Sequence, residues 1–416
     1  AFMLAIAHVL VNESLYDKDF IGKYTVGLDK FVPYLNGVID GCPKDPSWAS
    51  AITGIPAQTI IELAYRMAEC RTMIMTAWSL QRGDHGEQPI WLTVVLAALL
   101  GQIGLPGGGF GIGYGCENGV GNSVKYHKWP ALSQGSNKVT EFIPVARIAD
   151  MLLSPNQEFD YDGQRLKYPD IKLVYWAGGN PFHHHQDLRR LMDAFTKPEC
   201  IIVNEIWWTS TARHADIIFP ITTALERNDI MMTKWEQTAS PMHRAIDPIG
   251  ESKNDYDVFT ELSARLGCQE QFTEGRNEEE WLRHLWDQAR QQAGRAGFEL
   301  PDFDTFWTMG PIELLKPEGP TVLLSEFRKA PEKNPLSTPS GKIEIFSEVI
   351  EKFGYDNCKG CPVWMEPVEW LGSKKAKEYP LHLISNQPST RLHSQLDSGG
   401  ISRGSKIKGR EPMVMH

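Results

Sequence analysis

The sequence predicts an α/β protein in which short strands alternate with helices in more than one domain. Short apolar stretches that end at glycine or proline alternate with helical stretches along much of the chain. The length of 416 residues exceeds the roughly 250–300 at which a single hydrophobic core stops growing. A hydrophobic fraction of 42% and a charged fraction of 23% are typical of a globular protein.

The first α/β unit is predicted between residues 49 and 100, after an apolar helical pattern over residues 1–11. Gly54 ends one helix and Pro56 begins the next. Residues 72–78 are predicted as a buried strand, and residues 88–100 as a further helix. The order helix, strand, loop, helix is typical of an α/β domain.

A glycine-rich stretch over residues 107–115 follows this unit. Phosphate-binding glycine loops follow a strand and open a helix, whereas this stretch follows a helix. We therefore interpret it as a flexible or close-packed loop. Residues 118–141, rich in Gly, Ser and Asn, are predicted as a surface segment.

The second α/β unit is predicted between residues 171 and 220. Its expected elements are a strand at 171–176, a turn at 178–181, a helix at 187–195, and strands at 200–203 and 216–220. Three parallel strands follow from this order.

The later part of the chain is predicted to connect and extend these units. Helices are expected over residues 255–266 and 278–293, and a strand at 381–385 is expected to open a β-rich domain. The predicted domains are 1–160 and 161–269 (both α/β), 270–378 (connecting), and 379–416 (the start of a C-terminal β-barrel-like domain).

Charge and cysteine usage exclude several classes of protein. A net charge of -10 argues against nucleic-acid binding, which needs clustered Lys and Arg. The longest apolar run, residues 91–105, is broken by Gly101, Gln102 and Gly104 and is too short to span a bilayer. Seven cysteines contain one C-x-x-C pair, Cys358 and Cys361, which we interpret as two unrelated thiols.

Both ends of the sequence look like cuts through a longer polypeptide. The chain starts at Ala1 without an initiator Met and stops shortly after Pro412. We therefore expect an internal fragment.

The turn Gly178-Gly179-Asn180 lies where a parallel strand ends, the usual position of ligands in such sheets. Its glycines would let the backbone approach a diphosphate, and Glu205 follows the next strand, where it would accept hydrogen bonds from a ribose or guanine. A tight turn without a ligand explains the same residues equally well. The adjacent His183, His184 and His185 point in different directions, so they do not form a three-His metal site.

Three other groups of residues have both a functional and a structural explanation. Trp78, Arg82, Asp84, His85 and Glu87 crowd the loop after the first strand, as either a site or a solvated loop. Asp255 opens a helix, where capping alone explains a carboxylate. Arg391 with His393, Ser394 and Gln395 offers donors of several geometries, a weak signal by itself.

Several motifs occur together in one order along almost the whole chain. They are Trp78–Arg82, His85–Pro89, Gly101–Gly109, Gly178–Pro181 with His184–Asp187, Glu226–Ile230 and Arg391–Gln395. In this order they resemble the dimethyl sulfoxide reductase family of molybdopterin oxidoreductases, particularly its trimethylamine N-oxide and biotin sulfoxide reductase branch.

The resemblance implies two Rossmann-like parallel-sheet units around a cofactor cleft that holds molybdenum bis(molybdopterin guanine dinucleotide). It implies Trp78, Ser79 and Arg82 at one pterin and the substrate funnel, with Trp78 and Arg82 as the catalytic residues. The other implied contacts are Gly178, Gly179, Asn180 and His184 at a diphosphate, Asn204, Glu205 and Asp255 at guanosine, and Ser385, Arg391, His393, Ser394 and Gln395 at the cofactor from the last domain. No residue is predicted as a metal ligand, because the family's serine ligand lies upstream of the residues present.

By the same resemblance, the expected activity is removal of oxygen from N-oxides or S-oxides in the periplasm, or alternatively the cytoplasm, with electrons from a cytochrome or another redox protein. Gln387 and Cys361 stand where relatives carry histidine, and much of the substrate funnel lies upstream, so substrate preference stays open. The alternatives are a nitrate reductase or formate dehydrogenase relative, and a non-catalytic scaffold fragment. A nicotinamide dehydrogenase is disfavoured because no G-x-G-x-x-G follows a strand.

Overall fold

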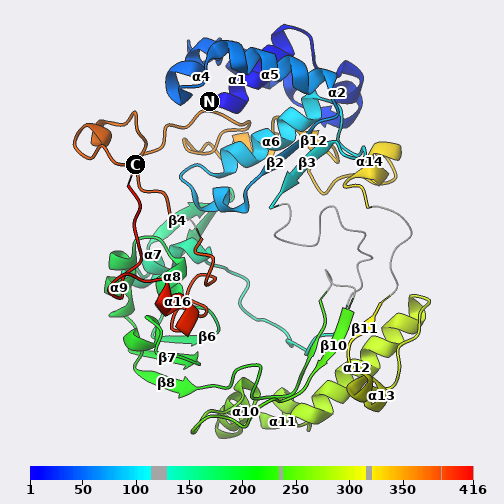
Figure 1. Ribbon diagram of the computed structural model, residues 1–416, viewed down its shortest axis with the longest axis vertical. Helices are drawn as coiled ribbons and strands as arrows, with labels where there is room; N and C mark the ends of the chain where they lie inside the picture. Colours follow the sequence, from blue (N-terminus) through cyan, green and yellow to red (C-terminus); the bar gives the residue numbers. More distant parts are fainter. Residues whose placement is uncertain (114–128, 234–237, 315–320, 386, 416) are drawn as a thin grey trace. The chain divides into compact units, whose positions relative to one another are not determined.

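The computed structural model describes residues 1–113, 129–233, 238–314, 321–385 and 387–415, which belong to two compact units (Figure 1). Unit 1 contains Ala1–Lys125 and Lys316–Leu383, and unit 2 contains Tyr126–Leu315 and Ile384–His416. The expected α/β class is confirmed, since each unit holds a small parallel sheet and helices. The division into four domains stays a prediction.

The central helix of unit 1 is α1, most of whose side chains are buried. Helix α1 has an apolar sequence, as predicted, and buries Leu4, Ile6 and Leu10 because α4, α5 and α6 all pack against it. The elements of unit 1 are α1 (Phe2–Asn12), α2 (Lys18–Tyr24), β1 (Thr25–Val26), α3 (Leu28–Leu35), α4 (Pro46–Thr53), α5 (Ala57–Glu69), β2 (Met73–Thr76), η1 (Trp78–Arg82), α6 (Glu87–Leu99), β3 (Gly109–Ile112), α14 (Ser325–Lys329), β12 (Ile343–Glu344), α15 (Glu348–Lys352) and η4 (Lys374–Lys377).

The predicted strand and helix of unit 1 are confirmed as β2 and α6, and β3 completes a β–α–β unit with β2 and β3 in parallel. The interpretation of residues 109–112 as a loop is wrong, because they form β3. Gly109 and Gly111 lack the side chains from which a strand is recognised, whereas the backbone of β2 supplies the hydrogen bonds. Gly115 and residues 118–128 lie outside the described residues, and 129–141 have no regular secondary structure.

Unit 2 contains the predicted three-stranded parallel sheet. Strand β7 (Cys200–Glu205) lies between β6 (Leu173–Ala177) and β8 (Ile217–Pro220), with Ala177 opposite Asn204 and Glu205 opposite Pro220. Successive side chains of a strand point to opposite faces of the sheet. Val174, Trp176, Ile201 and Val203 share one apolar core with α7 (Ile148–Leu153) and α9 (Leu188–Phe195). Tyr175 faces the other side, where its ring lies beside Phe259 of α10 (Asp255–Arg265).

The rest of unit 2 adds helices and two antiparallel sheets. The predicted helices over residues 255–266 and 278–293 are confirmed, and the second begins with a capping box between Asn277 and Glu280. The hairpin of β4 and β5 was missed, although Asp162-Gly163 is a typical hairpin turn and both residues have positive φ. The remaining elements are η2 (Val145–Arg147), β4 (Glu158–Tyr161), β5 (Gln164–Lys167), α8 (Pro181–His184), η3 (Ala212–His214), β9 (Asp229–Met231), β10 (Thr238–Met242), α11 (Gln269–Thr273), α12 (Glu278–Arg295), α13 (Phe303–Met309), β11 (Ile312–Glu313) and α16 (Gly400–Gly404).

The predicted strand at residues 381–385 is wrong. This segment has no regular structure, and Leu381, Leu383 and Ile384 are exposed. A strand needs a neighbouring strand for its backbone hydrogen bonds, and no described residue supplies one here. Residues 387–415 contain only α16 and two isolated bridges.

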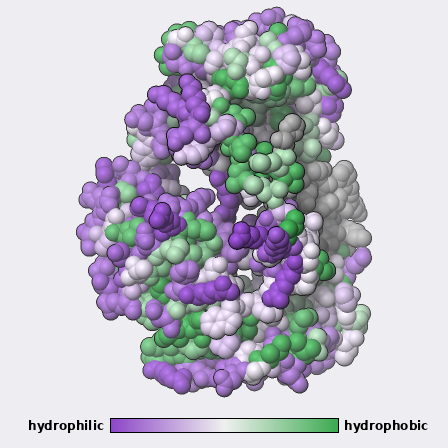
Figure 2. All heavy atoms as spheres, turned by 60° about the vertical axis from the view of Figure 1, so that its left-hand side comes forward, coloured by the Kyte–Doolittle hydropathy of each residue, from purple (hydrophilic) through white to green (hydrophobic). Residues whose placement is uncertain are grey.

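Exposed apolar side chains occur in both units. Figure 2 shows hydrophobic areas between hydrophilic ones on the visible face. Within the described ranges, no helix is both long and apolar enough to cross a membrane.

Cys358 and Cys361 are free thiols, and burial raises the pKa of Cys361 to about 12, so this thiol stays protonated at neutral pH.

Asp216 connects β7 to β8, because its Oδ2 accepts from the N–H of Ile201 at 2.8 Å and its own N–H donates to Ile201 O at 2.9 Å. We expect Asp216→Ala to lower the free energy of unfolding by about 1–3 kcal/mol, because the N–H of the buried Ile201 loses its acceptor. Urea unfolding measures the loss, and hydrogen exchange at the Ile201 amide should accelerate. Asp193→Ala, at an exposed position of α9, is the matched control, and an equal loss in both variants would contradict the prediction.

Candidate functional site

The carboxyl edge of β6 opens into a turn that only glycine adopts easily. Gly178 and Gly179 follow the strand with φ values of +82° and +80°. A Cβ at Gly178 would have no heavy atom within 4 Å, so one side of the turn is open. Asn180 comes next and is 4% exposed, and Pro181 begins α8. The turn therefore presents exposed backbone at the strand end.

Two buried N–H donors without a hydrogen-bond partner among the described residues belong to this turn and its strand. The Asn180 side chain accepts a hydrogen bond from the Thr211 hydroxyl through Oδ1, and its Nδ2 has no acceptor. The indole Nε1 of Trp176 is also buried without an acceptor, and lies 3.6 Å from the position of a Cβ on Gly179. A buried donor without a partner costs about 1–3 kcal/mol, so two of them together indicate a place for an acceptor-rich ligand.

A second polar group lies on the other face of the sheet, where Asn204 and Asp255 are brought together. Asn204 Nδ2 donates to Asp255 Oδ1 at 2.7 Å, and Asn204 Oδ1 accepts from the Tyr175 hydroxyl at 2.9 Å. Asn204 is only 2% exposed. Asp255 is the first residue of α10.

Glu205 is not part of that group. It follows Asn204 on the same strand and therefore faces the opposite side of the sheet. Its carboxylate accepts from the N–H of Ile206 and from the hydroxyl of Thr209, both at 2.9 Å. These bonds hold the loop after β7, so the structure gives Glu205 a local structural role.

The segment after residue 386 brings His393 beside His184. Their rings lie 5.0 Å apart between centroids. Arg391 forms ion pairs with Asp397 and Glu411, at 3.2 Å and 3.0 Å. Lys406 and Arg391 hold the pKa of Asp397 below its ordinary value. Of the other predicted residues here, Ser385 and Gln395 are exposed, and Ser394 is half-buried.

In unit 1, the predicted residues Trp78, Ser79 and Arg82 lie on the short helix η1 after β2, and all three are exposed. The Trp78 ring packs so closely on Gly113 that a Cβ there would lie 2.7 Å from Trp78 Cε3. The loop that follows is anchored by Asp84, whose Oδ2 accepts from the N–H of Val368 at 2.9 Å. Trp78 thus packs on Gly113 while half of its side chain is exposed to solvent.

The motif at Glu226–Ile230 has a structural explanation. Glu226 is buried, and it accepts from the N–H of Thr223 at 2.7 Å and from the N–H of Ile249 at 2.8 Å. These two backbone hydrogen bonds are the main reason why the pKa of Glu226 lies below its ordinary value. Its carboxylate therefore joins the loop after β8 to the loop before α10.

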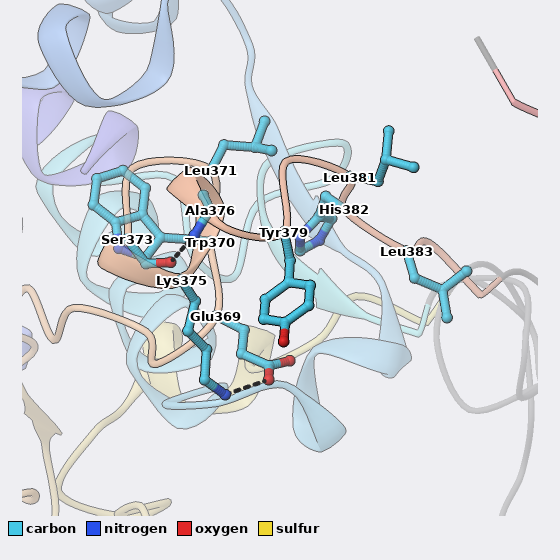
Figure 3. A pocket seen from close by; sticks show the side chains of 10 residues that line it. All are labelled: Glu369, Trp370, Leu371, Ser373, Lys375, Ala376, Tyr379, Leu381, His382 and Leu383. Atoms are coloured by element: carbon cyan, nitrogen blue, oxygen red, sulfur yellow. Dashed lines mark hydrogen bonds and ion pairs between the residues drawn. The ribbon is translucent and has the colours of Figure 1, made fainter.

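A separate pocket of about 350 Å³ lies in unit 1 and holds none of the predicted site residues. In Figure 3, the Tyr379 hydroxyl points toward the ion pair of Glu369 with Lys375, whose atoms are 3.1 Å apart. Leu371 and Leu381 extend to the opposite side. Among the described residues, no group of three or more His, Cys, Asp or Glu is placed to hold a metal ion.

Three residues that the sequence analysis did not single out contribute to these groups: Tyr175, Trp176 and Thr211. The available signal was polar atoms on buried strands and turns, which must find partners. That signal gives no partner's identity, because Asn204 pairs with Asp255 across 51 positions and Asn180 with Thr211 across 31.

Comparison with known proteins identifies the family. Residues 1–265, more than half of the chain, match the model of the molybdopterin oxidoreductase family. The chain belongs to this family. The predicted family is thereby confirmed, and membership implies a molybdenum–pterin cofactor.

Relatives within this family match the whole chain. Identities are 48% to the biotin sulfoxide reductase of Cereibacter sphaeroides, 47% to the dimethyl sulfoxide/trimethylamine N-oxide reductase of Rhodobacter capsulatus and 41% to trimethylamine-N-oxide reductase 1 of Escherichia coli K12. The matches cover 99–100% of this chain, but only 50–56% of each relative. The chain therefore spans about half the length of these relatives.

One solved structure is similar in fold. It is the acetylene hydratase from Pelobacter acetylenicus, with a TM-score of 0.62 and 20% identity over 97% of this chain and 55% of the other. At this identity the likeness shows the fold alone.

The residues of unit 2 fit a pterin cofactor that carries phosphate groups. The free Nδ2 of Asn180 and Nε1 of Trp176 are donors, and phosphate oxygens are strong acceptors. The open side of Gly178 leaves room beside the backbone.

The loop bonds of Glu226 predict a pH dependence. Because its folded-state pKa lies below the ordinary 4.5, its contribution to stability is complete above that value and is lost as the pH falls through the folded-state pKa. We expect Glu226→Gln to remove this part of the acid destabilisation, as measured by urea unfolding between neutral and acidic pH. Glu251→Gln, at an exposed neighbouring position, should leave the acid response as in the unmodified protein.

We expect Thr211→Val to destabilise the protein by about 1–3 kcal/mol, because the Oδ1 of buried Asn180 loses its donor while side-chain volume is kept. Thr308→Val removes an exposed hydroxyl of α13 and should cost less than about 0.5 kcal/mol. Equal losses in urea unfolding would show that the Thr211 hydroxyl does not support Asn180.

Proposed function

We propose that the protein to which this chain belongs removes oxygen from N-oxides or S-oxides at a molybdenum centre. The observation that carries this proposal is the identity of 41–48% over 99–100% of the chain to relatives named as biotin sulfoxide, dimethyl sulfoxide and trimethylamine N-oxide reductases. Trimethylamine N-oxide, dimethyl sulfoxide and biotin sulfoxide are accordingly the candidate substrates.

The proposed cofactor is molybdenum bis(molybdopterin guanine dinucleotide), and unit 2 would hold one nucleotide end. The free donors of Asn180 and Trp176, with backbone N–H groups at Gly178 and Gly179, would bind a diphosphate. On the other face of the sheet, Asn204 and Asp255 would meet the guanine base. His184 would lie at the diphosphate. His393, whose ring is next to that of His184, would contact the other pterin together with Ser394 and Gln395.

When bound, the cofactor supplies two-electron transfer of an oxygen atom from the substrate. The chain's own residues would bind, orient and stabilise charge. Arg82 would stabilise negative charge on the departing oxygen with its guanidinium, and Trp78 would form an apolar wall. The Trp78 ring packs on Gly113, which suits a wall of a substrate funnel. The bonds that hold Glu205 favour loop support for this residue instead of guanosine contact.

The proposed electron donor is a cytochrome or another redox protein, and the proposed location is the bacterial periplasm. Both proposals rest on the resemblance of this chain to its relatives.

The test uses the full-length protein purified with its cofactor. We expect molybdenum and two guanine nucleotides per chain, measured by metal analysis and by chromatography after acid hydrolysis. With a reduced dye as electron donor, at least one of the three oxides should be consumed, whereas nitrate should not. Arg82→Lys keeps a positive charge but loses the planar fork, so kcat/KM should fall by about a hundredfold.

Other outcomes would decide against the proposal. Molybdenum without activity on any of the oxides, together with nitrate reduction or formate oxidation, would assign the protein to another branch of the family. Absence of both molybdenum and guanine would support a non-catalytic scaffold.

A further inference from the structure

The hydroxyl of Tyr175 lies at one end of a hydrogen-bond chain that ends at Asp255. Tyr175 Oη is 2.9 Å from Asn204 Oδ1, and Asn204 Nδ2 is 2.7 Å from Asp255 Oδ1. An ionised carboxylate only accepts hydrogen bonds, so the amide nitrogen of Asn204 must face Asp255. The amide oxygen then faces Tyr175, whose hydroxyl must donate. The hydrogen bonds therefore all run in one direction, from the Tyr175 hydroxyl through Asn204 to Asp255.

Burial of Asn204 preserves this arrangement of hydrogen bonds. Asn204 is 2% exposed, so water does not replace Tyr175 as its donor. The Tyr175 ring packs against Phe259 of α10, with 5.4 Å between the ring centroids. Burial, and next the charge of Asp255, raise the pKa of Tyr175 above its ordinary value, so the hydroxyl keeps its proton at neutral pH.

Asp255 has one oxygen fixed and one available. Its Oδ1 accepts from Asn204, whereas no described residue donates to its Oδ2. Its place at the first position of α10 stabilises the negative charge. The result is an oriented carboxylate beside the carboxyl edge of the sheet, where ligands of such folds bind.

We propose that Tyr175 is a positioning residue that, through Asn204, orients Asp255 to recognise a guanine base. This inference rests on the proposed function, which supplies the guanine nucleotide. Guanine presents two adjacent N–H donors on its pairing edge, N1 and N2, and a carboxylate accepts from both together. Adenine lacks a donor at N1, so an oriented Asp255 selects against it. Tyr175 itself does not touch the base.

The test compares nucleotide binding by the full-length protein prepared without its cofactor. Calorimetric titrations with GDP and with ADP share the diphosphate contacts and differ in the base. Tyr175→Phe removes only the hydroxyl, and we expect GDP affinity to fall roughly fivefold to tenfold with ADP affinity unchanged. A general loss of structure would weaken both nucleotides, so the ratio of GDP to ADP affinity separates positioning from folding.

Tyr168→Phe is the matched control. Tyr168 is buried in unit 2, and its hydroxyl accepts from Arg147 at 3.4 Å, away from the hydrogen bonds of Asn204. Its affinity ratio should equal that of the unmodified protein.

Two results would overturn the inference. An unchanged affinity ratio in Tyr175→Phe would remove Tyr175 from base recognition and leave the proposed function intact. An unmodified protein that binds ADP as tightly as GDP would overturn the inference and also the proposed guanine site.

Discussion

The parallel pairing of β6, β7 and β8 is the constraint on which the candidate site of unit 2 depends. In this register Ala177 lies opposite Asn204, and Glu205 lies opposite Pro220, so the loops that follow all three strands start at one edge. Parallel pairing brings together the turn after β6, the loop after β7 and the loop before α10, although these segments lie far apart in the sequence.

Two asparagines at this edge, Asn180 and Asn204, are oriented by hydroxyl groups that donate hydrogen bonds to them. The amide oxygen of Asn180 is occupied by Thr211, and that of Asn204 by Tyr175. Their nitrogen atoms are therefore directed elsewhere, Asn180 Nδ2 without a partner in the described part of the chain and Asn204 Nδ2 to Asp255. One face of the sheet thus offers donors and the other an oriented carboxylate. This combination suits a ligand with an anionic linker and a donor-bearing base.

Several charged residues that the sequence analysis singled out support loops. Glu205, Glu226 and Arg391 each have nearby partners that account for their charge or hydrogen-bonding capacity. Trp78 and Arg82 lie on a short exposed helix at the end of β2. The motifs of the sequence therefore contain residues that hold loops as well as exposed residues.

The sequence by itself determined the α/β class, the strand–turn–helix at residues 173–195, the third parallel strand and the family, because periodicity, glycine and proline positions and ordered motifs are local signals. The tertiary structure alone decided that Gly109–Ile112 is a strand, that residues 381–385 are not, and that Tyr175 and Thr211 donate hydrogen bonds to Asn204 and Asn180. These outcomes depend on which backbone or hydroxyl lies opposite. A hydrogen bond across 51 positions leaves no periodic trace in the sequence.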